Sequence, residues 1–356
     1  MFLRGTLVGI TGSNGKSTVT TLVGQIALRA HERGGRPAFV GGNLGDALTL
    51  AVGTEAASER GVVVAELSSF QLEDATALRC HVAACLNVTD DHLDRHGTFA
   101  RYAAAKGRIF RMQAPGDFAV VPAGDELCLS LAKAGPASIR TFGAGGDVSV
   151  EAGVLRDRES DLSFPISALR IRGLHNQANA CAAALCARLA GLPRSAIEDV
   201  LASFAGLPHR MVLARELDGV AYYDDSKATN VGAAVAALEG LADLRGKVVL
   251  IAGGVDKGGS YAPLRERMDR LGRAVVLLGQ AAPLVRRAME GSALELREAA
   301  SMDEAVEVAR SLARPGDAVL LAPACASFDM FTGYAHRGDE FQRAVGALRT
   351  SAGGAR

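Results

Sequence analysis

The sequence predicts an α/β fold, with two doubly wound, mostly parallel sheets that follow one another along the chain. Short apolar runs, typical of buried strands, alternate with segments of helical periodicity over most of the 356 residues. Polar and glycine-rich loops come directly after several of these runs, which is where such sheets bind ligands. The length suits about two domains, each able to bury a core.

The predicted elements follow one another in a regular order. Strands are predicted at residues 7–10, 62–67, 82–88, 118–121, 248–252, 274–278 and 318–321. Helices are predicted at residues 18–33, 99–112, 176–190, 231–241, 263–271 and 302–313. Strands that alternate with helices favour parallel sheets covered on both faces.

Two stretches interrupt this order. Residues 143–172 are rich in Gly and Asp and alternate over short segments at 148–150, 162–164 and 169–171, so we expect a small antiparallel excursion there. The segment Gly-Leu-Pro-His-Arg at 206–210 follows a helical pattern and precedes a new series of strands. We place the domain boundary there, which gives domains 1–206 and 207–356.

The composition excludes several classes of partner. The formal net charge is +0, so no overall basic field favours nucleic acid or an anionic membrane. No apolar run is long enough to cross a bilayer, and the first residues lack the apolar core of a secretory leader. The six cysteines form no C-x-x-C pair, so we expect buried, reduced thiols and a cytoplasmic location. They are Cys80, Cys85, Cys128, Cys181, Cys186 and Cys325.

The strongest chemical signal is a glycine-rich loop between the first strand and the first helix. Its residues are Gly12, Ser13, Asn14, Gly15, Lys16, Ser17 and Thr18. Glycines let backbone N–H groups point inward, the helix contributes the positive end of its dipole, and Lys16 adds a cation. A hydroxyl at Ser17 or Thr18 suits Mg²⁺. The strict phosphate-loop pattern wants Gly where Ile10 stands, so the alternative is a glycine-rich turn with an incidental lysine.

Two further loops carry candidate metal ligands. Glu66 closes a strand beside the phosphate loop, which suits Mg²⁺, although an acid at a helix N-terminus is an equal alternative. Residues 87–96 read N-V-T-D-D-H-L-D-R-H and follow another strand. Three acids and two histidines there form either a solvated charged loop or a metal site, for which His92 is the best candidate.

Single polar residues on predicted helices allow two interpretations each. Lys106 lies among alanines, which favours a surface lysine, whereas partial burial would favour a neutral, nucleophilic amine. Asn176 and Asn179 lie one turn apart at the start of a helix. Their amides can cap that helix or read the edge of a purine.

In the second half of the chain, three polar loops each lead from a strand toward a helix. They occupy residues 223–230, 253–258 and 323–329. Because such loops converge at one edge of a sheet, and each carries a lysine or a hydroxyl, we expect a second site there for an anion or a carboxylate.

Taken together, these segments resemble one family over nearly the whole chain, the Mur ligases of peptidoglycan synthesis. The matching segments are T-G-S-N-G-K-S-T (11–18), G-G-N-L-G (41–45), E-L-S-S-F-Q-L-E (66–73), N-V-T-D-D-H-L-D-R-H (87–96), L-H-N-Q-A-N (174–179), L-P-H-R (207–210), D-D-S-K-A-T-N (224–230), D-K-G (256–258) and L-A-P-A-C-A-S-F-D (321–329). The segments 66–73 and 324–327 are similar to the branch that adds D-glutamate. The resemblance implies a P-loop domain followed by a smaller Rossmann-like α/β domain.

The resemblance also implies roles in binding nucleotide and metal. ATP would lie on residues 12–18 with Lys16 on its phosphates. Of two Mg²⁺ ions, Ser17 and Glu66 would hold one and His92 the other. Lys106 matches a lysine that becomes N-carboxylated, so the resemblance replaces its interpretation as a surface residue. Asn176 and Asn179 would contact the adenine, Asp225 the ribose and Arg210 the phosphates.

For the other substrates, the resemblance implies catalytic roles for Asn43 and His209 at the reacting end, beside Lys16, Lys106, His92 and Arg210. Lys227 and Lys257 would supply positive charge. The remaining expected substrate contacts are Ser68, Thr229, Ser327 and Tyr334. Two carboxylates and a polyphosphate repel one another in one cleft, so cations are needed there.

The implied reaction is a carboxylate activation. The carboxylate of UDP-N-acetylmuramoyl-L-alanine would attack the γ-phosphate of ATP, and the amine of D-glutamate would then displace phosphate from the acyl phosphate. The partners would be these small molecules, and the chain would act as a monomer. The family also has an N-terminal domain that grips the UDP group, which has no counterpart before residue 11, so we expect impaired ligation. The alternatives are a glutamate ligase similar to the folylpolyglutamate synthases, or a non-catalytic nucleotide-binding remnant.

Overall fold

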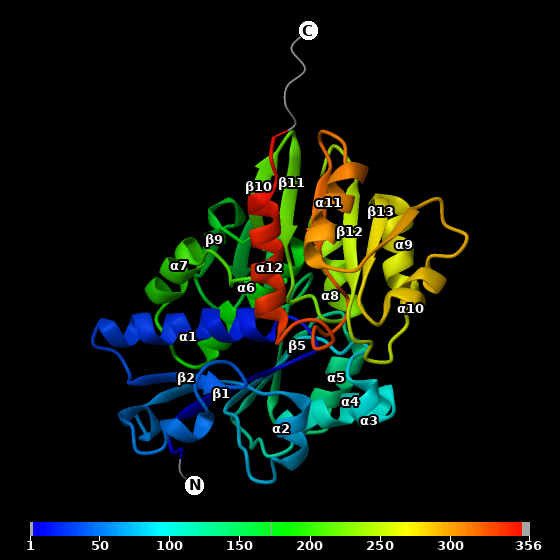
Figure 1. Ribbon diagram of the computed structural model, residues 1–356. Coiled ribbons are helices and arrows are strands. Elements are labelled where there is room, and N and C mark those ends of the chain that lie inside the picture. Colours follow the sequence, from blue (N-terminus) through cyan, green and yellow to red (C-terminus); the bar gives the residue numbers. More distant parts are fainter. Residues whose placement is uncertain (1–2, 172, 351–356) are drawn as a thin grey trace. The chain divides into compact units, whose positions relative to one another are not determined.

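The computed structural model describes residues 3–171 and 173–350, and these form two compact units. The first unit comprises Met1–Thr89 and His96–Gly206, and the second comprises Asp90–Arg95 and Leu207–Arg356. In Figure 1 the first unit carries mainly the blue-to-green part of the chain and the second the green-to-red part. The short segment Asp90–Arg95 therefore groups with the second unit, although it lies within residues 1–206 of the sequence.

The first unit contains a nine-stranded sheet with the order β2-β3-β1-β4-β5-β6-β7-β8-β9. The strands are β1 (Thr6–Thr11), β2 (Ala38–Gly42), β3 (Val62–Glu66), β4 (Val82–Cys85), β5 (Phe118–Pro122), β6 (Ser138–Phe142), β7 (Val148–Glu151), β8 (Val154–Asp157) and β9 (Ser163–Pro165). Neighbours from β2 to β7 pair in parallel, and β7, β8 and β9 pair antiparallel. The predicted parallel α/β architecture is confirmed for this unit.

The antiparallel end of this sheet differs from the predicted excursion in detail. Strand β8 was not predicted, because its charged residues Arg156 and Asp157 interrupt the alternation of apolar and polar residues. Residues 169–171 form no strand, because Leu169 ends the short helix η4 (Ile166–Ala168) and buries its side chain without a ladder. Arg172 lies outside the described residues. Short alternating segments therefore locate the excursion but not each of its strands.

Helices cover the parallel strands of the first unit. They are α1 (Lys16–Glu32), α2 (Ser69–Asp74), α4 (Phe99–Gly107), α5 (Glu126–Lys133), α6 (Leu174–Leu189) and α7 (Arg194–Ser203), and the short α3 (Leu93–His96) spans the two units. Leu7, Val63 and Ala83 of the sheet pack with Tyr102 of α4 and Cys128 of α5. The alternate residues of the same strands are also buried, which explains their continuous apolar runs.

The second unit contains a six-stranded sheet with the order β10-β11-β15-β12-β13-β14. The strands are β10 (Val212–Leu217), β11 (Val220–Asp224), β12 (Val248–Gly253), β13 (Gly272–Leu278), β14 (Glu295–Ala299) and β15 (Ala318–Leu321). Only the β10–β11 hairpin pairs antiparallel among these strands. The sheet is therefore doubly wound and mostly parallel, as predicted.

Two separate cores cover the faces of this second sheet. The helices are α8 (Val231–Glu239), α9 (Ala262–Leu271), α10 (Ala282–Ala288), α11 (Met302–Leu312) and α12 (Tyr334–Ala347). Leu238, Met268 and Val285 of α8, α9 and α10 pack on one face. Residues of α11 and α12 pack on the other, which leaves the loops at the strand ends to carry polar chemistry.

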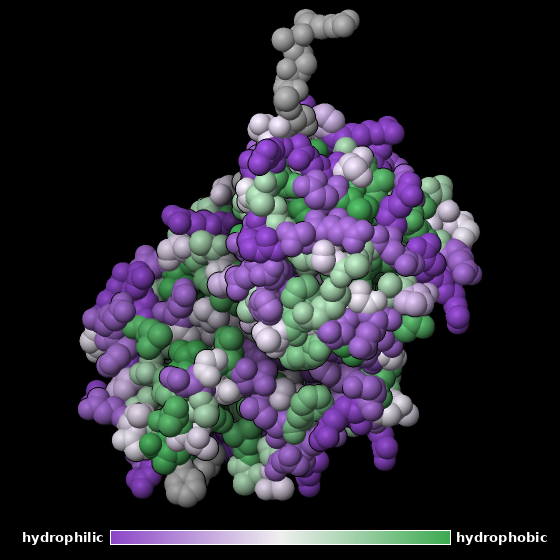
Figure 2. Space-filling view, in the orientation of Figure 1, coloured by the Kyte–Doolittle hydropathy of each residue, from purple (hydrophilic) through white to green (hydrophobic). Residues whose placement is uncertain are grey.

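The surface of the described residues shows no segregation of hydrophilic and hydrophobic residues on the visible face of Figure 2, and the cysteines are buried. Figure 2 shows hydrophilic and hydrophobic residues interspersed over the visible face. All six cysteines are buried and free, as expected from their apolar neighbours. No helix in residues 3–171 and 173–350 combines the length and the apolar character needed to cross a bilayer.

Candidate active site

The glycine-rich loop joins β1 to α1 in a conformation that only glycine adopts easily. Gly12 has a φ of 148° and Gly15, the N-cap of α1, a φ of 84°. A Cβ on Gly15 would lie 2.5 Å from Asn179 Oδ1, so this glycine also permits the close approach of α6. The loop therefore brings the predicted asparagine pair against the start of α1 within the first unit.

The segment after β4 braces this loop. Asn14 N donates to Asn87 Oδ1 at 2.8 Å, and Asn87 Nδ2 donates back to Asn14 O at 3.0 Å. Ser13 Oγ donates to Thr89 O and accepts from Thr89 N, both at 3.0 Å. These reciprocal bonds hold the loop open with few degrees of freedom, which suits a preformed anion site.

Two lysines meet at one carbonyl of the loop. Lys16 Nζ donates to Gly12 O at 2.7 Å and to Ser13 O at 2.9 Å. Lys106 Nζ donates to the same Gly12 O at 2.8 Å from α4. Lys106 is 1% exposed, so its interpretation as a surface lysine is wrong. Two cations therefore converge on the loop that is predicted to bind phosphates.

Tyr102 orients both the loop and Lys106. Its ring lies under Lys106 Nζ at 4.5 Å from the centroid, a cation–π arrangement. Its hydroxyl lies 3.0 Å from Ser13 Oγ, and because Ser13 gives its hydrogen to Thr89 O, Tyr102 is the donor. His96, one of the two histidines in the predicted metal loop, packs against Tyr102 and binds Ser69 Oγ at 3.0 Å. Burial and packing explain that histidine.

Glu66 stands beside the loop with one carboxylate oxygen in use. The pairing of β1 with β3 sets Glu66 opposite Ile10, two residues before Gly12. Asn43 Nδ2 donates to Glu66 Oε1 at 2.8 Å, whereas the buried Oε2 has no hydrogen-bond partner in the described structure. Ser68, not Glu66, caps α2, so the alternative role of Glu66 as a capping acid is wrong.

This donor set fits a hard divalent cation. Burying a carboxylate oxygen without a partner is unfavourable unless a hydrogen-bond donor or a cation binds it, and Mg²⁺ prefers carboxylate oxygens as ligands. The hydroxyl-bearing Ser17 and Thr18 are buried at the first turn of α1. No three His, Cys, Asp or Glu side chains of the described residues come together, so a cation here would need hydroxyl, substrate or water oxygens as well.

The asparagine pair lies in the first two turns of α6. Gly173 is the N-cap residue of α6 and no side chain completes that cap. Asn179 Nδ2 donates to Asn176 Oδ1 at 3.2 Å, which orders the two amides on one face of the helix. The amides remain candidates for base recognition next to Gly15.

His92 belongs to the segment that groups with the second unit. It has a φ of 53°, and its Nε2 lies 3.6 Å from Asp91 Oδ2. Asp91 also accepts from Lys257 Nζ at 3.1 Å and from Asn230 Nδ2 at 2.9 Å. Burial tends to raise the pKa of Asp91, but the charges of Lys257 and His92 and these hydrogen bonds hold it below its usual value. Lys257, predicted to bind substrate, is thus paired with a carboxylate.

His209 is fixed by a buried carboxylate. Its Nδ1 lies 2.7 Å from Asp224 Oδ2, and because a carboxylate only accepts, Nδ1 is the donor, while Nε2 lies 3.6 Å from Asp339 Oδ1. Gln342 Nε2 donates to the same Asp224 oxygen at 2.7 Å. A Cβ on Gly338 of α12 would lie 2.1 Å from His209 Nδ1. The ring is therefore oriented by β11 and α12 together.

Asp225 follows Asp224 and is almost fully buried. Burial, opposed by the nearby charge of Arg210 and reinforced by that of Asp224, raises the pKa of Asp225 to about 7. Arg210, predicted to contact phosphate, therefore lies close enough to interact with this carboxyl group. A carboxyl that is half protonated near neutral pH can donate as well as accept a hydrogen bond, which suits a hydroxyl-rich ligand.

Buried Arg337 joins two of the three polar loops of the second unit, and a β-bridge joins the third. Its Nε donates to Ser226 Oγ at 3.0 Å and its Nη2 to Ser226 O at 2.8 Å. Its Nη1 donates to Cys325 O at 3.2 Å and Ala326 O at 3.3 Å. Val255 and Ala326 are joined by an isolated β-bridge. The predicted convergence of these loops at one sheet edge is therefore observed.

The other predicted substrate residues lie on the same loops of the second unit. Lys227 Nζ sits 3.6 Å from the ring centroid of Tyr334, a second cation–π contact. Thr229 N donates to Lys227 O at 2.8 Å, and Ser327 is 2% exposed. They share one loop cluster, while Asn43 and Ser68 belong to the first unit.

Several residues that position the predicted site residues were not singled out from the sequence. Tyr102, Asp91, Asn230 and Arg337 each position a predicted site residue, yet the sequence analysis assigns them no role. Asp91 and Asn230 stand inside conspicuous polar motifs, so their motifs could have pointed to them. Arg337 sits on an ordinary amphipathic helix, and only the fold reveals its burial.

Comparisons with known proteins agree with this arrangement. Residues 10–187 match the Mur ligase middle domain, and residues 209–325 match the Mur ligase, glutamate ligase domain. The UDP-N-acetylmuramoylalanine–D-glutamate ligase of Pseudomonas aeruginosa is 48% identical over 351 residues, which cover 96% of this chain and 75% of that protein. The protein of the same name from Solibacter usitatus is 43% identical, over 98% of this chain and 77% of its own length.

Solved structures show the same fold at lower identity. The MurF ligase of Thermotoga maritima in complex with ADP has a TM-score of 0.70 and 21% identity, and covers 97% of this chain and 81% of that one. A folylpolyglutamate synthase of Mycobacterium tuberculosis has a TM-score of 0.67 and 17% identity, with 98% and 92% covered. These two likenesses show the fold alone, whereas the domain matches and the close relatives show the family. The chain belongs to the Mur ligase family.

Proposed function

We propose that this chain is an ATP-dependent ligase that joins D-glutamate to the alanine carboxylate of UDP-N-acetylmuramoyl-L-alanine. The observation that supports this most is the phosphate loop with Lys16 and Lys106 on one carbonyl and the unpartnered oxygen of Glu66 alongside. The relatives at 43% and 48% identity carry the name of this activity. A cytoplasmic location and a monomeric state accompany the proposal.

The reaction would pass through an acyl phosphate. The alanine carboxylate oxygen attacks the γ-phosphorus, ADP leaves, and the amine of D-glutamate then attacks the acyl carbon and expels phosphate. Backbone N–H groups of residues 12–18 and Lys16 would bind the polyphosphate, and Asn176 and Asn179 the adenine. Asp225 would bind the ribose and Arg210 the phosphates. One Mg²⁺ held by Ser17 and Glu66, and a second held by His92, would offset the negative charge between the reactants, and carboxylated Lys106 would supply a further oxygen ligand.

Residues of the second unit would handle the amine donor. Lys227, Thr229, Lys257, Ser327 and Tyr334 would bind D-glutamate, and the carboxylates of that substrate would compete with Asp91 for Lys257. His209, whose ring is oriented by the bond from Nδ1 to Asp224, would contact the reacting end of the substrates. Asn43 and Ser68 would contact the muramoyl substrate.

Ligation is tested by phosphate release that depends on all three substrates. Wild type should release phosphate only when ATP, UDP-N-acetylmuramoyl-L-alanine and D-glutamate are all present, and Lys16→Ala should bind ATP at least about tenfold more weakly because a charge-assisted contact is lost. Lys133→Ala, which removes a lysine from the end of α5, is the matched control. Release that requires a folate and L-glutamate would favour the folylpolyglutamate alternative, and ATP binding without release would favour a non-catalytic remnant.

Carboxylation of Lys106 needs a separate measurement. In the structure its ammonium is held by Gly12 O and the Tyr102 ring, so the carbamate would have to form with a neutral amine and turn its oxygens toward a cation. Wild type in ¹³C-bicarbonate with Mg²⁺ should give a carbamate carbon signal that Lys106→Ala lacks. A signal of equal size in both proteins, or in neither, contradicts the assignment whether or not the chain is an active ligase.

A further inference from the structure

A cavity lies within the second unit, at the opposite end of its sheet from the polar loops at residues 223–230, 253–258 and 323–329. Its volume is about 460 Å³. It is lined by Arg245, Gly246, Lys247, Asp269, Gly272, Arg273, Ala293, Leu294 and Arg314. Lys247 immediately precedes β12, Arg273 is the second residue of β13, and Leu294 immediately precedes β14. The cavity therefore sits at the amino ends of the parallel strands, whereas the polar loops described above follow their carboxyl ends.

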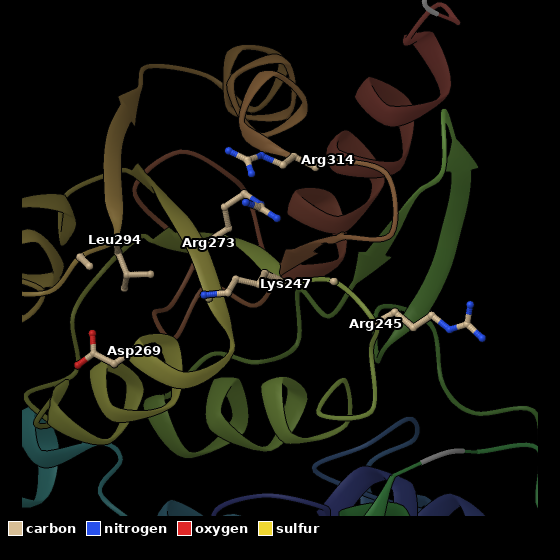
Figure 3. A pocket seen from close by; sticks show the side chains of 9 residues that line it. Arg245, Lys247, Asp269, Arg273, Leu294 and Arg314 are labelled. Atoms are coloured by element: carbon tan, nitrogen blue, oxygen red, sulfur yellow. The ribbon is translucent and has the colours of Figure 1, made fainter.

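Positive side chains dominate this cavity. Four of its lining residues are Lys or Arg, and its acid, Asp269, accepts a hydrogen bond from Arg265 at 3.2 Å. Figure 3 shows Lys247, Arg273 and Arg314 over the strand ends, with Asp269 apart from them and Arg245 directed away. Within residues 3–171 and 173–350, neither Lys247 Nζ nor the guanidinium of Arg314 has an ion-pair partner.

One buried carboxylate fixes the backbones that carry these cations. Asp317 Oδ1 accepts from Lys247 N at 2.8 Å and from Arg273 Nη2 at 3.0 Å. Its Oδ2 accepts from Arg314 N at 2.8 Å and from Arg273 Nε. Asp317 is 2% exposed, so these bonds are shielded from water. Three separate segments of the chain are thus tied to one acid before any ligand arrives.

Sequence and packing keep this arrangement rigid. A Cβ on Gly246 would lie 2.5 Å from Asp317 Oδ1 and 2.4 Å from Gly316 O, so glycine is required next to Lys247. Because Asp317 neutralises only Arg273, the charges of Lys247 and Arg314 remain for a ligand. The backbone positions of Lys247 and Arg314 are therefore fixed, which reduces the ordering that binding an anion requires, while their exposed side chains can reach a ligand.

We propose that this cavity binds a diphosphate group, either as free pyrophosphate or as part of a nucleoside diphosphate. Separated cations match the adjacent charges of a diphosphate better than the single charge centre of orthophosphate. The guanidinium of Arg314 can donate two parallel hydrogen bonds to phosphate oxygens, and Lys247 can act as a point charge. Ala293 and Leu294 give one wall an apolar surface, and the volume leaves room for an attached group. The proposal does not depend on the ligase function.

Selective labelling of lysine separates this cavity from the phosphate loop. The chain has six lysines, and the backbone amide of Lys247 reports the cavity while that of Lys16 reports the loop. In the full chain labelled with ¹⁵N-lysine, pyrophosphate should shift the Lys247 signal at lower concentration than orthophosphate does. The signal is assigned by its loss in Lys247→Ala.

Arg314→Ala tests the contact while it keeps the Lys247 probe. It should weaken the pyrophosphate response at Lys247 about tenfold or more, since a charge-assisted contact is removed. Arg287→Ala, which removes the same charge from the exposed end of α10, should leave it unchanged. A response to ADP or UDP at lower concentration than to pyrophosphate identifies a nucleotide as the occupant, and the reverse order identifies free pyrophosphate. No Lys247 response, an equal response to orthophosphate, or an unchanged Arg314→Ala response overturns the proposal.

Discussion

Arg337 is the largest fully buried side chain that the structure describes. All three of its guanidinium nitrogens donate hydrogen bonds to the loops at residues 226 and 325–326. Burial lowers the pKa of Arg337 to about 10, so the side chain stays charged at neutral pH. These hydrogen bonds give Arg337 a structural role, which is to hold the two loops in place.

Replacing Arg337 should therefore destabilise the fold. Arg337→Ala leaves a cavity and unpaired carbonyls, and should lower the free energy of unfolding by about 3–5 kcal/mol in urea titrations. Arg343→Ala removes an arginine on the same helix whose ion pairs with Asp303 and Glu340 are exposed, and should leave stability nearly unchanged. Equal losses in the two variants would contradict this account.

Asp225 makes stability depend on pH in an unusual direction. Its folded pKa, raised to about 7 by burial, lies above the unfolded value of about 3.9. Between these values the folded chain holds a proton that the unfolded chain has released, so stability falls as pH rises. The stabilising contribution of protonated Asp225 is fully present below the unfolded pKa and is lost as the pH rises through the folded pKa. The free energy of unfolding falls by up to about 1.4 kcal/mol per pH unit over this range.

The matched substitutions isolate that contribution. Asp225→Asn should flatten the fall in unfolding free energy between pH 5 and 8, measured by urea titration at each pH. Asp243→Asn, at an exposed position after α8, should keep the wild-type slope. An Asp225→Asn slope that matches wild type would show that this carboxyl is already ionised in the folded chain.

At the scale of elements, helix α12 packs against the site residues of the second unit and positions several of them. It supplies Gly338 against His209, Gln342 to Asp224 and Arg337 to the polar loops. No helix is predicted there, because its buried face includes Arg337 and Gly338, which a hydrophobic pattern does not count. Strands such as β1, β3 and β12 were predictable because both their faces are buried, which leaves a continuous apolar run.

Two glycines of α12 give a matched test of this packing. Gly338→Ala would place a Cβ against His209 and should lower the unfolding free energy by about 1–3 kcal/mol. Gly346→Ala meets nothing within 4 Å and should raise it by about 0.5–1 kcal/mol through helix propensity. Urea titration measures both. A gain in stability for Gly338→Ala would mean that His209 can move aside freely.

At the scale of the whole molecule, the sequence predicts sheets and loops better than it predicts the partners of each side chain. The residues of the phosphate loop are consecutive in the sequence, so the spacing of Gly12 and Gly15 is enough to predict it. The burial of Lys106 depends on Tyr102 and on a carbonyl 94 residues away, and no pattern around it reports that. The pairing of His209 with Asp224 likewise appears only once β11 is folded. Long-range contacts are thus what the sequence leaves out.

The length of the relatives gives a prediction for the chain as a unit. The 356 residues span 75% of the Pseudomonas aeruginosa protein, and the resemblance implies that the remainder grips the UDP group. Expressed by themselves, these residues should show a higher KM for UDP-N-acetylmuramoyl-L-alanine and a lower kcat than that relative, because remote binding energy orients the reacting carboxylate. Steady-state phosphate release measures both constants.

The control is the same chain with the N-terminal residues of that relative in front. This fusion should recover much of the rate. If residues 1–356 alone match the relative in both constants, the grip on UDP contributes little to catalysis.

The carbonyl of Gly12 would make the proposed nucleotide binding an exchange reaction. Lys16 and Lys106 already donate to it, so a polyphosphate that recruits either lysine replaces an existing acceptor and does not meet a bare cation. The measured affinity is then the difference between two hydrogen-bonded states, and the gross strength of the phosphate contacts exceeds it. A weak anion gains little by such a swap, whereas a triphosphate presents enough oxygens to outcompete the carbonyl.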